Sequence, residues 1–375
     1  TRRSPYPGGS RFTSSTKASQ YFMTTDHWWT TPAAPPSDTM ASQATERQNQ
    51  LTKPPGALGR LEQLAIRLAA IQNRLKPAVD HVFISVFAGD HGIVEEGVSA
   101  FPQSVTVEMQ RNFVAGGAAI SVLAKTLGAS LEVINTGTLA DPQQLPGVIH
   151  APIASQTANF LHQEAMTELQ WQQALALGRA AVDRALCQNT QLFIGGEMGI
   201  GNTTAATAML SALTGIPAAD ITGPGTGLNS HGVQHKARVI NQALAFHRPS
   251  LTDAGHISRI VGGFEISALS GAYIAAAQAG MAVMVDGFIC TAAAAAAQQI
   301  NPSIKPYLFY SHCSAEPGHQ RIIAHLNIDP IVDLNLRLGE GSGAATVVPL
   351  LRMACALHGQ MATFAEAAVS EKLED

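Results

Sequence analysis

Short apolar runs alternate with longer segments of helical spacing along most of this chain. The apolar runs are 81–88, 131–136, 191–195, 281–285 and 306–310. Such runs are typical of strands that are buried on both faces of a parallel sheet, and we expect a further strand near 258–262. The helical segments between them are 112–127, 164–187, 203–213, 264–279 and 288–299. This alternation predicts an α/β fold, a doubly wound parallel sheet of about six strands with helices on both faces.

The two ends of the chain have a different pattern. Apolar residues repeat at helical spacing over 56–75, which predicts an amphipathic helix. We expect segments 40–78 and 345–375 to form a small helical domain beside a large α/β catalytic domain over 79–344. Residues 1–39 mix Arg, Ser, Thr, Pro and Gly, and we interpret them as a disordered tail.

The composition narrows the class of protein. Hydrophobic residues make up 46% of the 375 positions, and the net charge is -4 without a long basic run, which argues against nucleic acid as a partner. The four cysteines are far apart, as in a cytoplasmic protein with reduced thiols. Residues 1–50 lack the apolar core of a signal peptide. Asp286 interrupts the apolar stretch 271–299, which favours a buried helix–strand–helix over a membrane span.

Polar and glycine-rich clusters follow three of the predicted strands, at 88–92, 195–204 and 311–314. The carboxyl ends of parallel strands meet at one edge of a sheet, where ligands bind in folds of this kind. The pattern therefore predicts one composite site at that edge.

Glu340 lies between two glycines, immediately before an apolar helical segment. Backbone N–H groups at a helix start favour anions, so this segment can bind a phosphate. The alternative is that Glu340 or Ser342 only caps the helix.

The segment 197–204 has two interpretations of the same kind. Asn202 and Thr203 either contact a ligand or cap the following helix. A glycine turn at 223–227 with Lys236 downstream fits a monophosphate, although an exposed helical lysine is the more common case. Asp90 and His91 supply too few ligands for a metal site, so we expect hydrogen bonding within a turn.

Taken in order, these clusters resemble those of the nicotinate-nucleotide–dimethylbenzimidazole phosphoribosyltransferase family of cobalamin biosynthesis. The resemblance covers about Leu51 to about Ala367. Its motifs are LTKPPGALGRLE (51–62), AGDHG (88–92), GEMGIGNTT (196–204), VGGFE (261–265), DGF (286–288), SHCSAE (311–316) and RLGEGSGA (337–344). It implies a Rossmann-like large domain, a small helical domain from both chain ends, and a homodimer.

The resemblance also implies roles for individual residues. The catalytic base of the family falls on Glu340. The pocket for the acceptor base falls on Glu197, Phe101, Met109 and Leu338. Phosphate and ribose contacts fall on Gly199, Asn202, Thr203, Gly225, Lys236, Ser314, Arg337, Gly339 and Gly341. One departure from the family pattern is Pro224 in the phosphate turn, where a proline has no N–H to donate.

The implied reaction moves the phosphoribosyl group of nicotinate mononucleotide to a benzimidazole. The leaving group is a pyridinium, whose ring nitrogen becomes neutral as the bond breaks, so we expect neither a metal nor a cofactor. The partners are then small-molecule substrates, without nucleic acid or membrane. Two other classes stay open: an NAD-dependent oxidoreductase, which would need a GxGxxG turn with a downstream acid, and a nucleotide-binding protein without catalysis.

Overall fold

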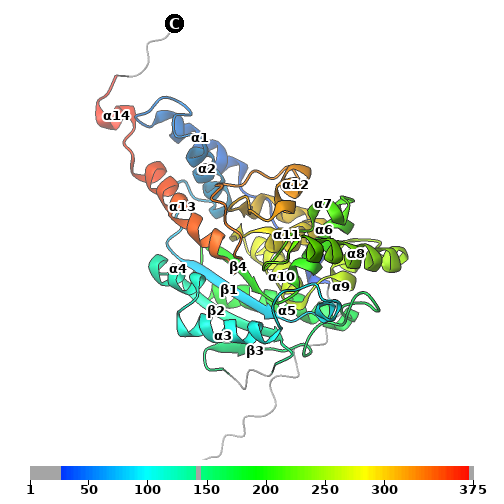
Figure 1. Cartoon of the computed structure of the whole chain (residues 1–375). Coiled ribbons are helices and arrows are strands. Elements are labelled where there is room, and N and C mark those ends of the chain that lie inside the picture. The colour runs from blue at the N-terminus through cyan, green and yellow to red at the C-terminus, as the bar shows by residue number, and fades with distance from the viewer. Residues whose placement is uncertain (1–26, 141–144, 371–375) are drawn as a thin grey trace, which may run out of the picture.

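The computed structural model describes residues 27–140 and 145–370, and its centre is a sheet of six parallel strands (Figure 1). The strands are β1 (Val82–Gly89), β2 (Ser130–Gly137), β3 (Val148–His150), β4 (Leu192–Met198), β5 (Ala282–Val285) and β6 (Leu308–Tyr310). Their order is β3-β2-β1-β4-β5-β6, which is the strand order of the Rossmann fold and confirms the predicted fold class. The order reverses between β1 and β4, and a crevice opens at such a point.

Helices cover both faces of this sheet. The α-helices are α1 (Asp38–Gln50), α2 (Arg60–Gln72), α3 (Ser104–Ala115), α4 (Ala119–Leu127), α5 (Glu168–Leu186), α6 (Asn202–Thr214), α7 (Ala218–Ile221), α8 (Ser230–His247), α9 (Ala254–Val261), α10 (Phe264–Gln278), α11 (Phe288–Ile300), α12 (Pro317–His325), α13 (Ser342–Gln360) and α14 (Phe364–Ala367). Short 3-10 turns cover Trp28–Thr30, Gly92–Glu96, Arg248–Ser250 and Pro302–Tyr307.

Two neighbouring glycines in β4 show how closely the helical layers on the two faces of the sheet approach this strand. Successive strand residues face opposite sides. A Cβ at Gly195 would meet Leu269 and Tyr273 of α10, whereas a Cβ at Gly196 would collide with the backbone of Glu340, just before α13. Larger residues at these positions would force either layer away from the strand.

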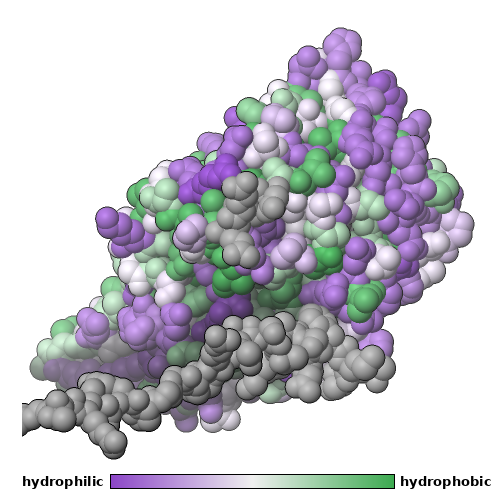
Figure 2. Space-filling view, turned by 90° about the horizontal axis from the view of Figure 1, so that it is seen from below, coloured by the Kyte–Doolittle hydropathy of each residue, from purple (hydrophilic) through white to green (hydrophobic). Residues whose placement is uncertain are grey.

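The apolar stretch 271–299 is a helix–strand–helix, as predicted. It contains the end of α10, all of β5 and most of α11, and nearly every residue is buried. In the part of the chain that the structure describes, no helix is long and apolar enough to cross a membrane. The face in Figure 2 mixes apolar and hydrophilic residues.

Several predicted elements need correction. The strand expected near 258–262 is wrong: this segment lies in α9 and its end. Ile257, Ile260 and Val261 are buried there at helical spacing, and the Asp253 carboxylate accepts a hydrogen bond from the His256 N–H (3.0 Å). The sixth strand is β3, which is only three residues long.

Glycines set helix boundaries that apolar spacing did not reveal. The predicted helix over 112–127 is two helices, because α3 ends at Gly116, whose φ is 83°. The predicted helix over 56–75 covers only 60–72, since Gly56 and Gly59 have positive φ and Asn73 ends the helix in the left-handed region.

The terminal helices α1, α2 and α13 lie side by side (Figure 1). Arg47 on α1 donates to the carbonyl of His358 (2.8 Å), and the Gln48 amide contacts the His358 ring (2.9 Å). Leu51 and Thr363 form an isolated antiparallel bridge. These contacts agree with a unit built from both chain ends, while its proposed boundaries, 40–78 and 345–375, stay a prediction.

The expected tail over 1–39 needs correction in its last third, and residues 1–26 lie outside the described residues. Trp29 is buried against Trp171, with ring centroids 5.5 Å apart. The Asn301 amide donates to the carbonyls of Trp29 (3.0 Å) and Thr31 (2.8 Å), and the Tyr307 hydroxyl donates to that of Ala34 (2.6 Å). The segment therefore packs on the large domain.

Replacing Trp29 tests this packing. We expect Trp29→Ala to lower the free energy of unfolding by about 3 kcal/mol, because it leaves a cavity against Trp171. The neighbouring Trp28 is only partly buried, so Trp28→Ala is the matched control with a smaller loss. Urea titrations measure both, and equal losses for the two variants would contradict the proposed anchor.

Candidate functional site

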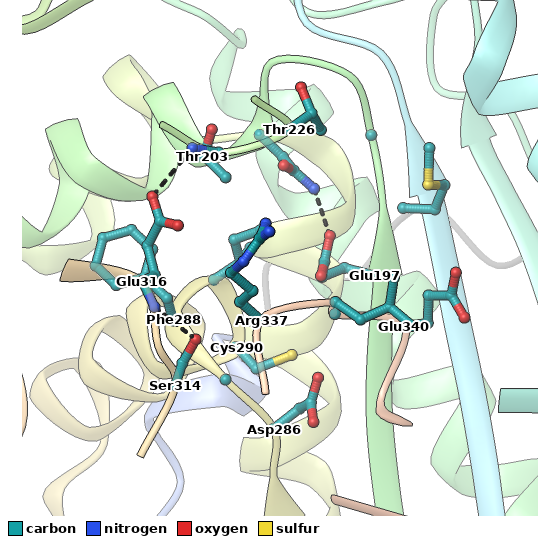
Figure 3. A pocket seen from close by; sticks show the side chains of 18 of the residues that line it. Glu197, Thr203, Thr226, Asp286, Phe288, Cys290, Ser314, Glu316, Arg337 and Glu340 are labelled. Atoms are coloured by element: carbon teal, nitrogen blue, oxygen red, sulfur yellow. Dashed lines mark hydrogen bonds between the residues drawn. The ribbon is translucent and has the colours of Figure 1, made fainter. Parts of the chain in front are cut away.

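A cavity of about 360 Å³ opens beyond the carboxyl ends of the central strands (Figure 3). Its walls come from the ends of β4, β5 and β6, the starts of α6 and α11, the glycine turn at 223–227 and the segment 337–340. Residues that are far apart in sequence thus meet at the edge that the polar clusters predicted.

Most of the predicted site residues line this cavity. They are Phe101, Met109, Glu197, Gly199, Asn202, Thr203, Gly225, Ser314, Arg337, Leu338, Gly339 and Glu340. Lys236 and Gly341 are the exceptions. Lys236 is buried behind the wall, where its Nζ donates to Thr203 Oγ1 (2.7 Å), and the Gly341 N–H donates to Asp286 Oδ2 (3.2 Å).

Asp286, Phe288 and Glu316 also line the cavity, and no role was predicted for them. The family motifs at 286–288 and 311–316 contain all three. Asp286 directly follows β5. Its position at the carboxyl end of a strand is the sequence feature that could have identified it as a site residue.

Glu340 lies in an unusual backbone turn. Its φ is 65°, and those of Gly339 and Gly341 are 87° and 83°, so three successive residues adopt the left-handed region. For a residue with a side chain this conformation costs about 1–2 kcal/mol. Strain of this kind is concentrated at functional sites.

The capping interpretation of Glu340 and Ser342 is wrong. Gly341 is the N-cap of α13, and no side chain at this position caps the helix. The Ser342 hydroxyl donates backwards, to the Gly339 carbonyl (2.7 Å). Asp286 accepts the N–H groups of Gly341 (3.2 Å) and Ala344 (2.8 Å) instead.

The Glu340 carboxyl is therefore available for another role. It is buried, and its Oε2 has no hydrogen-bond partner among the described residues. Burial raises its pKa, the Ile120 N–H at the start of α4 opposes this shift, and the charge of Asp286 adds to it. A buried carboxyl with spare acceptor capacity beside a cavity suits proton transfer.

Glu197, at the end of β4, faces the same cavity. The Asn202 amide donates to its Oε2, so Asn202 does not cap α6, whose N-cap is Gly201. Burial raises the pKa of Glu197 to about 8, and the nearby charges of Asp286, Glu265 and Glu340 contribute. The buried Glu197 carboxyl therefore binds its proton more tightly than an exposed glutamate does.

A set of donors lies at the other end of the cavity. Thr203 lies at the start of α6, and the Gly225 N–H donates to Glu316 Oε1 (3.2 Å) in the glycine turn. Burial lowers the pKa of Lys236 to about 8, while Glu316 opposes the shift. The Glu316 carboxylate thus lies against the glycine turn, and its charge acts on the buried Lys236.

The side of the cavity with Phe101, Met109 and Leu338, predicted as the pocket for the acceptor base, is apolar and open. Phe101 is 48% exposed and Leu338 60% exposed, although both border the cavity. Met109, on α3, lines the cavity as well and is partly buried. An aromatic ligand would cover this surface.

The expected hydrogen bonding of Asp90 and His91 within their turn is wrong, because both side chains bond to other elements. Asp90 accepts from the Thr106 hydroxyl (2.6 Å) and the Leu139 N–H (2.9 Å). His91 Nε2 contacts Glu265 Oε1 (2.7 Å), and both side chains are fully buried.

Comparison with known proteins agrees with this geometry. The model of a family described as Phosphoribosyltransferase matches residues 33–369. The nicotinate-nucleotide–dimethylbenzimidazole phosphoribosyltransferase of Pseudomonas fluorescens is 57% identical over 345 residues, which is 92% of this chain and 98% of the relative. Its namesake from Pseudomonas aeruginosa is 55% identical over 345 residues, with the same coverage. A crystal structure of the Thermus thermophilus protein of that name superposes with a TM-score of 0.84 at 40% identity, covering 90% of this chain and 100% of that one.

The raised pKa of Glu197 has a measurable consequence. The folded state binds this proton more tightly than the unfolded state, where the pKa is near 4.5, so stability falls as pH rises from about 5 to about 8. We expect Glu197→Gln to reduce this slope by up to about 1.4 kcal/mol per pH unit. Urea unfolding across that range measures it, with the exposed Glu108→Gln as control. Equal slopes in Glu197→Gln and the parent would contradict a buried proton.

Proposed function

The chain belongs to the nicotinate-nucleotide–dimethylbenzimidazole phosphoribosyltransferase family, and we propose that its cavity transfers the 5-phosphoribosyl group of nicotinate mononucleotide to 5,6-dimethylbenzimidazole with Glu340 as the base. The products are α-ribazole 5′-phosphate and nicotinate. The same proposal covers related bases, because the apolar acceptor side is open at Phe101 and Leu338.

The observation that carries this proposal is the arrangement of one cavity with two opposite ends. Figure 3 shows Glu197 and Glu340 on one side and Thr203 and Glu316 on the other. Gly225 and the buried Lys236 lie beside Thr203. A nucleotide held by its phosphate at the second end reaches the carboxyls with its base and ribose C1.

The leaving group requires little assistance. The glycosidic nitrogen of nicotinate mononucleotide is positively charged, and breaking its bond to C1 returns the electron pair to that nitrogen. Positive charge grows on the ribose as the bond loosens. The Glu340 carboxylate borders the cavity, and its negative charge favours the charged ribose.

The acceptor must attack and lose a proton. The unprotonated benzimidazole nitrogen forms the new bond to C1 on the face opposite the departing nicotinate, and the N–H of the other ring nitrogen gives its proton to Glu340. Burial raises the pKa of Glu197 to about 8, which favours its protonated form, and a protonated carboxyl does not compete with Glu340 for this proton. Two carboxyls with different environments thereby take different roles.

The phosphate serves as a handle. The N–H groups at the start of α6 and in the glycine turn, together with Lys236, favour an anion. Holding the nucleotide at this remote group aligns C1 with the acceptor, and such alignment supplies a large part of rate enhancement.

Further features belong to the proposal. We propose a homodimer, because Phe101 and Leu338 leave an apolar rim exposed at the cavity. We also propose a cytoplasmic location, which suits the free cysteines, of which Cys290 and Cys355 are buried.

Small molecules are the proposed substrates. The proposed domains are a small helical domain over 40–78 and 345–375 and a large catalytic domain over 79–344.

The role of Glu340 is tested by Glu340→Gln, which keeps size and removes the base. We expect turnover to fall about 10²- to 10⁴-fold with nicotinate mononucleotide binding retained. Chromatography of nicotinate released in the presence of dimethylbenzimidazole measures turnover, and calorimetry measures binding. The exposed Glu108→Gln is the control. Near-normal turnover in Glu340→Gln would remove Glu340 from its role, and no release by the parent would favour a binding protein.

The phosphate end is tested by Lys236→Met. We expect the KM for nicotinate mononucleotide to rise about 10- to 100-fold, because the positive charge that lies behind Thr203 is lost. Nicotinate riboside lacks the phosphate and is the matched substrate, whose slow reaction should not change. Since the pKa of Lys236 is about 8, the parent KM for the mononucleotide should also rise above that pH. Equal losses for both substrates would contradict a phosphate contact.

A further inference from the structure

Asp286 connects the sheet to the turn that carries Glu340. It directly follows β5 and is buried, with only 1% of its surface exposed. Its Oδ1 accepts the N–H of Ala344 (2.8 Å), and its Oδ2 accepts the N–H of Gly341 (3.2 Å). One side chain thus binds both ends of the first turn of α13, where the N-cap glycine offers no side chain.

The turn needs such an anchor. Three successive left-handed residues are an unfavourable conformation for a chain containing Glu340. Other hydrogen bonds of the segment are local: the Ser342 N–H donates to the Gly339 carbonyl (3.0 Å), and the Ala345 N–H to that of Gly341 (3.0 Å). Local bonds keep the shape of the turn, but they do not fix its place on the sheet.

We propose that Asp286 is a positioning residue for the transfer reaction: its two hydrogen bonds hold the strained turn on the sheet and thereby keep the Glu340 carboxylate at the cavity. The inference rests on the proposed role of Glu340 as the base. Asp286 acts through Glu340 and needs no contact with the reacting atoms.

Asp286 also acts through its charge. The titratable groups that face it are His312 at the end of β6 (Nδ1 to Oδ1 3.9 Å), Glu197 on β4, Cys290 on α11, Tyr273 on α10 and Glu340 itself. Burial is the main cause of the raised pKa of Glu340, and the negative charge of Asp286 raises that pKa further. A neutral residue at this position should therefore lower the pKa of the base.

Asp286→Asn tests both effects. An amide has one acceptor oxygen, so one of the two N–H groups loses its partner. We expect kcat to fall about 10- to 100-fold, with the Kd for nicotinate mononucleotide within about 3-fold of the parent, since the phosphate end is untouched. The acid limb of the pH profile of kcat should move to lower pH. A merely structural lesion would not move that limb.

Asp90→Asn is the matched control. Asp90 is also fully buried and also accepts two hydrogen bonds, but neither comes from the Glu340 turn. We expect it to lower stability without moving the acid limb. If Asp286→Asn does not accumulate as folded protein, Asp286→Ser, which is smaller and also uncharged, takes its place with the same expected changes.

A double-mutant cycle with Glu340→Gln separates the inference from the proposed function. If Asp286 acts through Glu340, its replacement has little further effect on kcat in the Glu340→Gln background. Additive losses, or a single variant with parental kcat and an unmoved acid limb, would overturn the positioning role. Near-normal turnover in Glu340→Gln alone would instead overturn the proposed base.

Discussion

The close packing of the Gly339–Gly341 turn on β4 is the constraint on which the site depends. A Cβ at Gly196 would collide with the Glu340 backbone, and a Cβ at Gly339 would collide with the Glu197 carboxyl. A left-handed turn brings the chain this close, and Asp286 holds it there through the Gly341 N–H. The glycines therefore determine where two carboxyl groups meet, although none of them takes part in the chemistry.

This arrangement costs stability. Glu197, Asp286 and Glu340 are all buried, and burial raises the pKa of each carboxyl, with repulsion between the carboxylates contributing at Glu197 and Glu340. Carboxyls that are easily protonated are poor contributors to folding at neutral pH. The large apolar core around β1, β4 and α10 offsets this cost, and the protein retains in Glu197 a carboxyl whose pKa is raised to about 8.

The sequence predicted the fold and the cavity well where one local signal decides the outcome. The continuous apolar run at 81–88 is long enough for a doubly buried strand and too short for a typical helix, and the glycine-rich clusters at strand ends located the cavity. The error near 258–262 has a different origin: a short apolar segment fits a strand or a buried helix equally, and the Asp253 cap that settles it is one residue. Trp29 was missed because its partner, Trp171, is distant in sequence.

Asp286 shows the deeper limit of sequence reasoning. A motif identified the segment, yet the motif alone does not reveal that the carboxylate caps a helix more than 50 residues further along the chain. The sequence shows that α13 begins near Gly341, and the local candidates for its cap are Glu340 and Ser342. Because a distant residue meets that requirement, Glu340 keeps its acceptor capacity for a substrate. Tertiary structure thus decides which of two carboxylates supports the backbone and which one is available for chemistry.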